Sequence, residues 1–321
     1  MHAWRTISVR VRRGGAPDHT PRARRTANVP RKAGTHPALS TDMPDCQQTD
    51  PTQSAWQASL RLRFADDAGT TRLMERVHSG PLRVQKTLYP EGPRICHAIV
   101  VHPPGGVVGG DRLSVRIDAG GAAHAFLTSP GAAKWYRANG KVSRQEVLIE
   151  ARAAAAVEWM PQEAIFFNGA HVALEQRVEL AADASYIGCD ILCFGRRASG
   201  ETFDRGTITQ HTQIRRGGKL LWWEQGALHG GSAAMHSPLG LNGASVCATL
   251  VGVGKPAGGA LIDTMRALDP ALGITQVKSV FVARYLGNDS ESARRAIFSV
   301  WQLLRPHLLG CAAPLPRIWS T

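Results

Sequence analysis

Short runs of alternating apolar and polar residues fill the chain from about Trp56 onward. The run LSVRID at 113–118 alternates strictly, and VALEQRVEL at 172–180 alternates in part. A period of two is typical of a strand with one buried face, and Gly, Pro and Asn separate the runs. Further strands are expected at 96–101, 124–128, 145–150, 157–160, 164–167, 186–194, 207–215, 220–225, 245–251 and 279–286. The pattern therefore predicts a mostly β protein.

Only about two helices are expected, one at 260–268 and a stronger one that begins after Asp289 or Ser290, either of which can act as the N-cap. The second helix should bury one stripe and end near Pro306. Its stripe residues recur at three- or four-residue steps: Ala293, Ile297, Val300, Leu304 and His307. Because no helices alternate with the strands, a βαβ architecture is excluded, and a sandwich, a barrel or a β-solenoid remains. No repeat of fixed period is present.

The positive charge is concentrated at the amino terminus. Of the net charge of +13, residues 1–42 carry +7, from nine Arg or Lys and two Asp. This stretch is rich in Pro, Thr, Gly and Ala and cannot bury enough apolar surface to offset its ordering entropy. We expect residues 1–54 to be a disordered basic extension and residues 55–321 to form one β domain. The extension could be a transit peptide or a nucleic-acid-binding arm, or translation could begin at Met43.

The sequence also suggests a cellular compartment. No apolar run approaches the ~20 residues that span a bilayer, and no signal-peptide core is present. The six cysteines are scattered without a C-x-x-C pair, which fits reduced thiols in the cytoplasm. Cys189 and Cys193 would lie about 13 Å apart along a strand at ~3.3 Å per residue, too far to share a metal ion. We interpret them as small buried residues.

Motifs for catalysis are missing from the sequence. HPPGGVVGGD at 102–111 must turn tightly and approach its surroundings closely, but it lacks the Lys and Ser/Thr of a P-loop. The Gly254-Lys255 pair runs into Pro256, and no G-x-G-x-x-G, H-E-x-x-H or G-x-S-x-G is found. The histidines His97, His124 and His211 lie within strand patterns and are interpreted as satisfied core or surface side chains. The chain is not expected to be an enzyme.

Several carboxylates interrupt apolar runs, where ionised side chains are costly. Asp190 lies within IGCDILCF at 187–194, Glu224 follows LLWW, and Glu163 stands in MPQEAIFF. A buried carboxylate persists if it is paired, hydrogen-bonded to the backbone, or needed for a cation. Pairing remains a full alternative, because three arginines could neutralise Asp190, Glu201 or Asp204: Arg196, Arg197 and Arg205. Two interpretations of the segment GRRASGE at 195–201 remain open. It is a rigid connection whose charges face a partner protein or an internal carboxylate, or it is a solvated loop.

Four segments in order resemble the urease accessory protein family UreD, also called UreH. They are HPPGGVVGGD at 102–111, TSPGAAKWYR at 128–137, EWMPQE at 158–163 and GRRASGE at 195–201. The ending, from LRPH at 304–307 through LPRIW at 315–319, is also similar to that family. The resemblance runs from about Trp56 to Thr321 and leaves the basic extension outside it.

The resemblance implies a helically wound, β-solenoid-like stack of sheets with a non-catalytic role. UreD proteins bind apo-urease together with UreF and, through UreF, the GTPase UreG, and the assembly loads nickel into urease. A separate GTPase fits the missing P-loop here. No tightly bound cofactor is expected. Transient binding of nickel is expected instead, because UreD is thought to pass nickel through its interior. Binding of nucleic acid by the basic extension is the alternative function.

A passage for nickel would need successive weak oxygen sites, because Cys/His cages would retain the ion. The resemblance makes Asp111, Asp190 and Glu224 the first candidates, followed by Glu163 and Glu201. In some relatives an acidic residue is expected directly after Gly-Gly-Asp, whereas this chain has Arg112 at that position. An adjacent cation would weaken nickel binding at Asp111. Structural or partner-binding roles are predicted for six further residues: Gly105, Gly106, Gly109, Gly110, Arg196 and Arg197.

Overall fold

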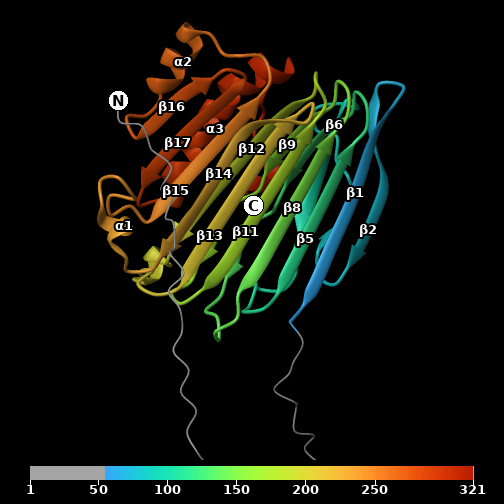
Figure 1. Cartoon of the computed structure of the whole chain (residues 1–321). Helices are drawn as coiled ribbons and strands as arrows, with labels where there is room; N and C mark the ends of the chain where they lie inside the picture. Colours follow the sequence, from blue (N-terminus) through green and yellow to red (C-terminus); the bar gives the residue numbers. More distant parts are fainter. Residues whose placement is uncertain (1–54, 321) are drawn as a thin grey trace, which may run out of the picture. The chain divides into compact units, whose positions relative to one another are not determined.

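The computed structural model describes residues 55–320, which form two large β-sheets with short helices at their margins and one long helix (Figure 1). From edge to edge, the smaller sheet contains β14 (Lys219–His229), β13 (Thr207–Arg216), β11 (His171–Leu180), β8 (Ser143–Ala151), β5 (Arg112–Ala119), β1 (Gln57–Asp67) and β2 (Thr70–Ser79). The predictions for residues 1–54 lie outside the described residues.

The larger sheet has ten strands. In order it contains β16 (Leu272–Val277), β17 (Val280–Gly287), β15 (Val246–Val253), β12 (Ser185–Phe194), β9 (Ala156–Met160), β6 (His124–Thr128), β4 (Ile95–Val101) and β3 (Arg83–Val84). Two short strands, β7 (Ala133–Trp135) and β10 (Ala164–Phe166), pair in parallel with each other, and β10 pairs with the end of β12. They belong to the larger sheet but lie off its main strand order.

The chain winds as a helix from one sheet to the other. After β5 in the smaller sheet it passes through β6 and β7, returns to the smaller sheet at β8, and repeats this circuit through β9 and β10 to β11. Successive turns therefore pair in parallel, and Arg112, Arg144, Ala173 and Thr209 stand in register. The spacing between these positions varies, which explains why the sequence shows no fixed period. The predicted solenoid-like β fold is confirmed.

Burial follows the alternation that predicted the strands. In β1, Leu60, Leu62 and Phe64 point inward and are at most 1% exposed, whereas the residues between them face solvent. By contrast, β12 is buried along both faces, because the smaller sheet covers one face and a helix covers the other. This double burial accounts for the nearly continuous apolar run around Asp190.

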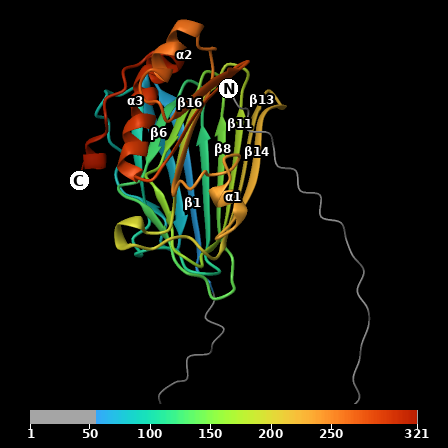
Figure 2. The ribbon, with the colours of Figure 1, turned by 90° about the vertical axis from the view of Figure 1, so that its left-hand side faces the viewer.

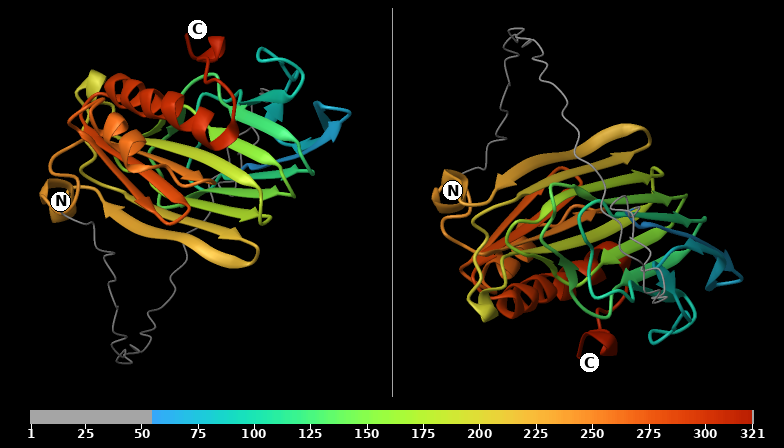
Figure 3. Two further views of the ribbon diagram at one scale, coloured as in Figure 1. Left: turned by 90° about the horizontal axis from the view of Figure 1, so that it is seen from above. Right: turned by 90° about the horizontal axis from the view of Figure 1, so that it is seen from below.

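The long helix α3 (Ser290–Leu309) packs on β15, β17 and β12 of the larger sheet (Figures 2 and 3). Asp289 is its N-cap and accepts a hydrogen bond of 2.8 Å from the Ser292 amide. The helix continues three residues past Pro306 and ends at Gly310, which adopts the left-handed conformation. The second predicted helix is α2 (Gly259–Arg266), and α1 (Ala233–His236) adds a single turn.

Two apolar cores result. One fills the space between the sheets, and the other lies between the larger sheet and α3. Since α2 and α3 both pack on the larger sheet, no long helix of residues 55–320 covers the outer face of the smaller sheet. None of the helices within residues 55–320 is long and apolar enough to cross a membrane.

Candidate functional site

A small polar cavity of about 10 Å³, roughly the space of one water molecule, lies between the two sheets. Its walls combine carboxylates, amides and hydroxyls with a few apolar groups: Gln176, Tyr186, Gly188, Asp190, Gln210, Thr212, Ile214, Glu224, Thr249 and Val251. Two of the five predicted carboxylates, Asp190 and Glu224, therefore share one interior site although they stand on different sheets.

Asp190 reaches this cavity from β12. Along β12 its side chain points to the same face as Gly188 and Leu192, toward the smaller sheet. Its one hydrogen bond from a side chain comes from Gln210, whose Nε2 lies 3.2 Å from Oδ2. Burial, and after it the negative charge of Glu224, raises the pKa of Asp190 from 3.8 to about 6. Asp190 is thus an interior carboxylate without a cationic partner among the residues described.

Glu224 has a different environment. It stands on β14 opposite Thr212, and Arg284 of β17 donates a hydrogen bond from its guanidinium to Glu224 Oε1 across the gap between the sheets. Strand register places Asp190, Thr249 and Arg284 side by side on the facing sheet. The single guanidinium therefore neutralises Glu224 and leaves Asp190 with an amide only.

Asp111 closes the glycine-rich loop. Its carboxylate accepts hydrogen bonds from two backbone amides, Trp56 at 2.9 Å and Val108 at 3.0 Å, and the residue is only 4% exposed. Burial lowers the pKa of the nearby His102, whereas the charge of Asp111 raises it, and the net direction is downward. The structure gives Asp111 a role in holding the loop, and its predicted contact with nickel stays a prediction.

Two glycines of this loop have geometries that other residues would strain. Gly110 has a φ of +97°, which side chains with a Cβ rarely adopt. A Cβ on Gly106 would lie 2.7 Å from the Lys134 carbonyl oxygen and 2.6 Å from the Tyr136 ring, so the backbone approaches the next turn of the solenoid closely. Gly105 and Gly109 belong to the same loop, and Gly105 accepts a hydrogen bond from the Tyr136 hydroxyl.

The remaining predicted residues lie apart from the cavity lining. Glu163 is 8% exposed and faces Arg294 of α3 at 3.7 Å. Glu201 forms two hydrogen bonds with Arg196, at 2.9 and 3.2 Å, and the Arg196 guanidinium lies 4.3 Å from the centre of the Phe167 ring. This is one of the pairings that the sequence left open, and it is an exposed one. Arg197 begins a 3₁₀ turn, Arg197–Ser199, and faces solvent.

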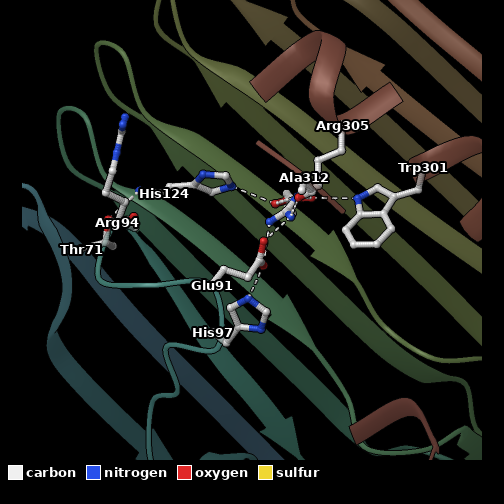
Figure 4. A network of polar contacts seen from close by, with 9 residues as sticks. Thr71, Glu91, Arg94, His97, His124, Trp301, Arg305 and Ala312 are labelled. Atoms are coloured by element: carbon white, nitrogen blue, oxygen red, sulfur yellow. Dashed lines mark hydrogen bonds and ion pairs between the residues drawn. The ribbon is translucent and has the colours of Figure 1, made fainter. Parts of the chain in front are cut away.

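A second interior charge cluster was not singled out in the sequence (Figure 4). Arg305 of α3 is fully buried and donates from Nε to both carboxylate oxygens of Glu158, at 2.9 and 3.0 Å. Its other nitrogens reach Glu91 and the Ala312 carbonyl oxygen. Trp301 adds a hydrogen bond of 2.9 Å to Glu158. We refer to Glu91, Glu158 and Arg305, with His97 and His124, as the Arg305 cluster.

The two histidines complete the Arg305 cluster. His97 Nε2 lies 2.7 Å from Glu91, and His124 Nε2 lies 2.8 Å from Glu158. Burial raises the pKa of Glu91, but hydrogen bonds and charge from His97 and Arg305 outweigh it and lower the value to about 2. The same balance, with His124 and Arg305 as partners, lowers the pKa of Glu158. Both histidines are satisfied within the fold, as the sequence predicted, but for the third, His211, the buried Nε2 has no hydrogen-bond partner within residues 55–320.

No group of three or more His, Cys, Asp or Glu side chains is placed to hold a metal ion together within residues 55–320. Cys189 and Cys193 are free and pack with the apolar side chains beneath α3. Burial raises the pKa of Cys193 to about 12, so its thiol is protonated at neutral pH. Asp190 and Glu224 are thus the predicted carboxylates that come together, and they do so as a pair.

The family model for the UreD urease accessory protein matches residues 57–320, nearly the whole described part of the chain. The chain belongs to the UreD urease accessory protein family. A urease accessory protein UreD from Janthinobacterium sp. (strain Marseille) is 61% identical over 271 residues, which cover 83% of this chain and 92% of the relative. A UreD from Nitrosospira multiformis is 52% identical and is covered over 99% of its length. One from Dechloromonas aromatica is 44% identical, with 95% of the relative covered.

The four segments that resemble UreD stack on consecutive turns of the solenoid. The Val107 amide donates to the Lys134 carbonyl, and the Ala133 amide donates to the Glu163 carbonyl. Farther along, the Gly195 amide donates to the Phe166 carbonyl. Residues that are distant in the sequence therefore lie on neighbouring turns and are joined by backbone hydrogen bonds.

Proposed function

We propose that this UreD-family chain is a urease maturation factor. In this role it acts as a scaffold without catalytic chemistry of its own, binds apo-urease together with UreF and, through UreF, the GTPase UreG, and assists nickel insertion. Family membership over residues 57–320 supports the maturation role. The interior pair of Asp190 and Glu224 supports a direct contribution to nickel transfer.

The cavity offers nickel a set of weak oxygen ligands. Besides the two carboxylates, it is lined by the side chains of Gln210, Thr212 and Thr249. Nickel is a borderline ion that binds imidazole and thiolate more tightly than such oxygens, so an oxygen-lined site would release its cargo readily. A weak site is what transfer requires, because the ion must leave for the final centre in urease.

Asp190 is the better ligand of the pair. Arg284 already occupies one oxygen of Glu224, whereas Asp190 receives only the Gln210 amide. With a pKa of about 6, Asp190 is mostly ionised at neutral pH and becomes protonated in mild acid. Protons therefore compete with nickel below pH 6, and transfer through this site should weaken there.

The other three candidates have partners that reduce their availability. Asp111 accepts a hydrogen bond from a backbone amide on each oxygen, Glu163 faces Arg294, and Glu201 is held by Arg196. A carboxylate that already has a cation or two backbone donors gains less from binding nickel. Among the predicted residues, the structure therefore favours Asp190 first and Glu224 second as nickel ligands.

The test is the double variant Asp190→Asn, Glu224→Gln, co-expressed with the urease subunits, UreF and UreG. We expect the complex with UreF to persist on size-exclusion chromatography, while the nickel content per urease active site falls at least about tenfold, since each lost charge removes a ligand from an interior site. The matched control is Glu175→Gln, Glu179→Gln, which removes two carboxylates from β11 on the outer face of the smaller sheet. Full nickel loading by the cavity variant would reject Asp190 and Glu224 as ligands, and absence of any complex with the wild-type chain would reject the scaffold role.

A further inference from the structure

One end of the solenoid presents four stacked loops. Because β5, β8, β11 and β13 run parallel, the four loops that precede them lie at the same end, seen face-on in the right panel of Figure 3. We call this the end-loop surface and define it as residues 105–111, 136–142, 167–170 and 203–206. It is separate from the Asp190 cavity lining, and no residue of the surface lines that cavity.

Exposed cations follow one another across the end-loop surface. Lys141 passes beside Gly110, Arg137 lies along Gly169, and Arg205 follows on the next turn. The loops are joined by hydrogen bonds from the Ala138 amide to the Gly169 carbonyl, at 3.0 Å, and from the Gly169 amide to the Arg205 carbonyl, at 2.8 Å. All three cations are exposed, and none forms an ion pair with another residue of the described part of the chain.

These cations contrast with the nearby Arg196, which Glu201 neutralises. The exposed carboxylate of the surface is Asp204, and it accepts a hydrogen bond of 2.6 Å from the Thr202 hydroxyl. Three unpaired cations against Asp204 and the buried Asp111 leave the surface with a net charge of +1. Its local charge therefore favours a negatively charged partner.

Two exposed apolar side chains accompany the cations. Val108 is 50% exposed and Val142 is 43% exposed, and a hydrogen bond of 2.9 Å from the Ser143 hydroxyl to the Val108 carbonyl ties their loops together. Single-stranded nucleic acids are bound by basic grooves with aromatic stacking platforms, whereas interfaces with proteins combine apolar contacts with a polar rim. The aromatic side chains of the surface, Tyr136 and Phe167, are half-buried and pack edge-to-face with 4.8 Å between ring centres, and Arg196 covers the Phe167 ring. Exposed valines beside cations thus favour a protein partner.

The end-loop surface is also held in place before any partner binds. Asn168 Oδ1 accepts hydrogen bonds from the amides of both Asp204 and Arg205, at 3.0 and 2.9 Å. Asp111 fixes the glycine-rich loop in the same way through Trp56 and Val108. A pre-organised surface loses less conformational entropy on binding, so even a modest contact area can give useful affinity.

The geometry points to the end-loop surface as a docking site for a partner protein whose own face carries Asp or Glu side chains around an apolar contact. This inference rests on the proposed function, since it assigns one of the maturation partners to a defined part of the chain. Val108 and Val142 would supply the apolar contact, and Lys141, Arg137 and Arg205 would pair with the partner's carboxylates.

The test uses the full-length triple variant Arg137→Glu, Lys141→Glu, Arg205→Glu and measures its Kd for purified apo-urease and for UreF separately. We expect the affinity for one of the two to fall at least about tenfold and its salt dependence to flatten. The matched control, Lys86→Glu, Lys219→Glu, Lys255→Glu, makes the same change in net charge at exposed lysines elsewhere and should alter either Kd less than threefold. Unchanged thermal unfolding of both variants would show that the fold is retained.

Several outcomes would overturn the inference. One is a triple variant that binds both proteins like the wild type, and another is a control that loses as much affinity as the triple variant. Loss of binding to a duplex DNA probe, with both protein affinities intact, would assign the surface to nucleic acid instead. If the wild-type chain itself bound neither apo-urease nor UreF, the proposed function would fail first, and that result differs from a loss confined to the triple variant.

Discussion

Glu91 of the Arg305 cluster and Asp190 of the cavity are both interior carboxylates, but their pKa values shift in opposite directions. In the Arg305 cluster, partners outweigh the burial of Glu91 and lower its pKa to about 2. In the cavity, burial and Glu224 together raise the pKa of Asp190 to about 6. Desolvation acts on both, so the difference comes from the partners.

Those partners differ in number and direction. Arg305 faces both carboxylates of its cluster, and each carboxylate also contacts a histidine. In the cavity, one arginine serves Glu224 alone, and Asp190 is left with the Gln210 amide. A fully partnered carboxylate fixes a helix to a sheet, whereas a carboxylate without a cation stays available to bind one. Burial alone therefore does not separate carboxylates that are already paired with a cation from those that can still bind one.

The largest effect should come from Arg305→Met. Removal of the guanidinium leaves Glu91 and Glu158 buried without it, and breaking a buried pair in this way costs about 3–5 kcal/mol of the free energy of unfolding. Urea unfolding at pH 7 measures the loss. The control Arg295→Met, which removes an exposed ion pair with Glu291, should change stability by less than about 0.5 kcal/mol.

Arg305→Met could prevent folding altogether, and a compensated variant covers that case. Adding Glu91→Gln and Glu158→Gln removes the stranded negative charges, so the triple variant should recover much of the lost stability. If Arg305→Met were as stable as the control, the cluster would not hold α3 to the sheet.

A smaller, pH-dependent loss is expected for Glu91→Gln. Because the folded-state pKa of Glu91 lies below its ordinary value of 4.5, its ionised form stabilises the fold above pH 4.5, and this contribution disappears as pH falls toward 2. At pH 7 the variant should lose about 2–3 kcal/mol, and the deficit should shrink in acid. Unfolding curves at pH 7 and pH 3.5 test this, and an equal deficit at both would show that ionisation is not its cause.

Asp190→Asn should have the opposite sign. The folded-state pKa of Asp190 lies above its ordinary 3.8, so ionisation opposes folding, with a penalty that is absent below pH 3.8 and complete above pH 6. Asparagine keeps an oxygen for Gln210 and should stabilise the protein by about 2 kcal/mol at pH 8 but hardly at pH 4. A loss of stability at pH 8 would mean that Asp190 is paired more strongly than its contacts indicate.

Strand alternation predicted most of the fold. The runs at 113–118 and 172–180 correspond to β5 and β11, and the predicted helices correspond to α2 and α3. The hairpin of β1 and β2 was not predicted. β1 alternates as strictly as β5 and was overlooked, whereas β2 is an edge strand whose side chains are mostly exposed and whose apolar alternation is weak. The choice of a solenoid came from the family resemblance, since periodicity alone does not distinguish it from a sandwich.

The candidate site was less predictable. Asp190 was predicted as a site residue because an ionised side chain within an apolar run is costly. Glu224 was predicted because it directly follows such a run. That they face each other depends on how the two sheets pack, because β12 lies in the larger sheet and β14 in the smaller, and no local pattern encodes this packing. The Arg305 cluster was missed because Glu91, Glu158 and Arg305 are far apart in the sequence. The signal that could have found it is Arg305 itself, which directly follows Leu304 on the buried stripe of α3.

The smallest effect is expected for Glu201→Gln, which separates pairing from burial. Like the carboxylates of the Arg305 cluster, Glu201 has an arginine partner. The hydrogen bond from Arg196 lowers the pKa of Glu201 more than burial raises it. The pair is exposed, however, and solvent screens its charges, so the unfolding midpoint at pH 7 should not move beyond experimental error. A loss comparable to that of Glu91→Gln would show that pairing stabilises this fold regardless of burial. An unchanged midpoint would instead confine the large effects to the interior, where a missing partner decides between a structural carboxylate and one free to bind a metal ion.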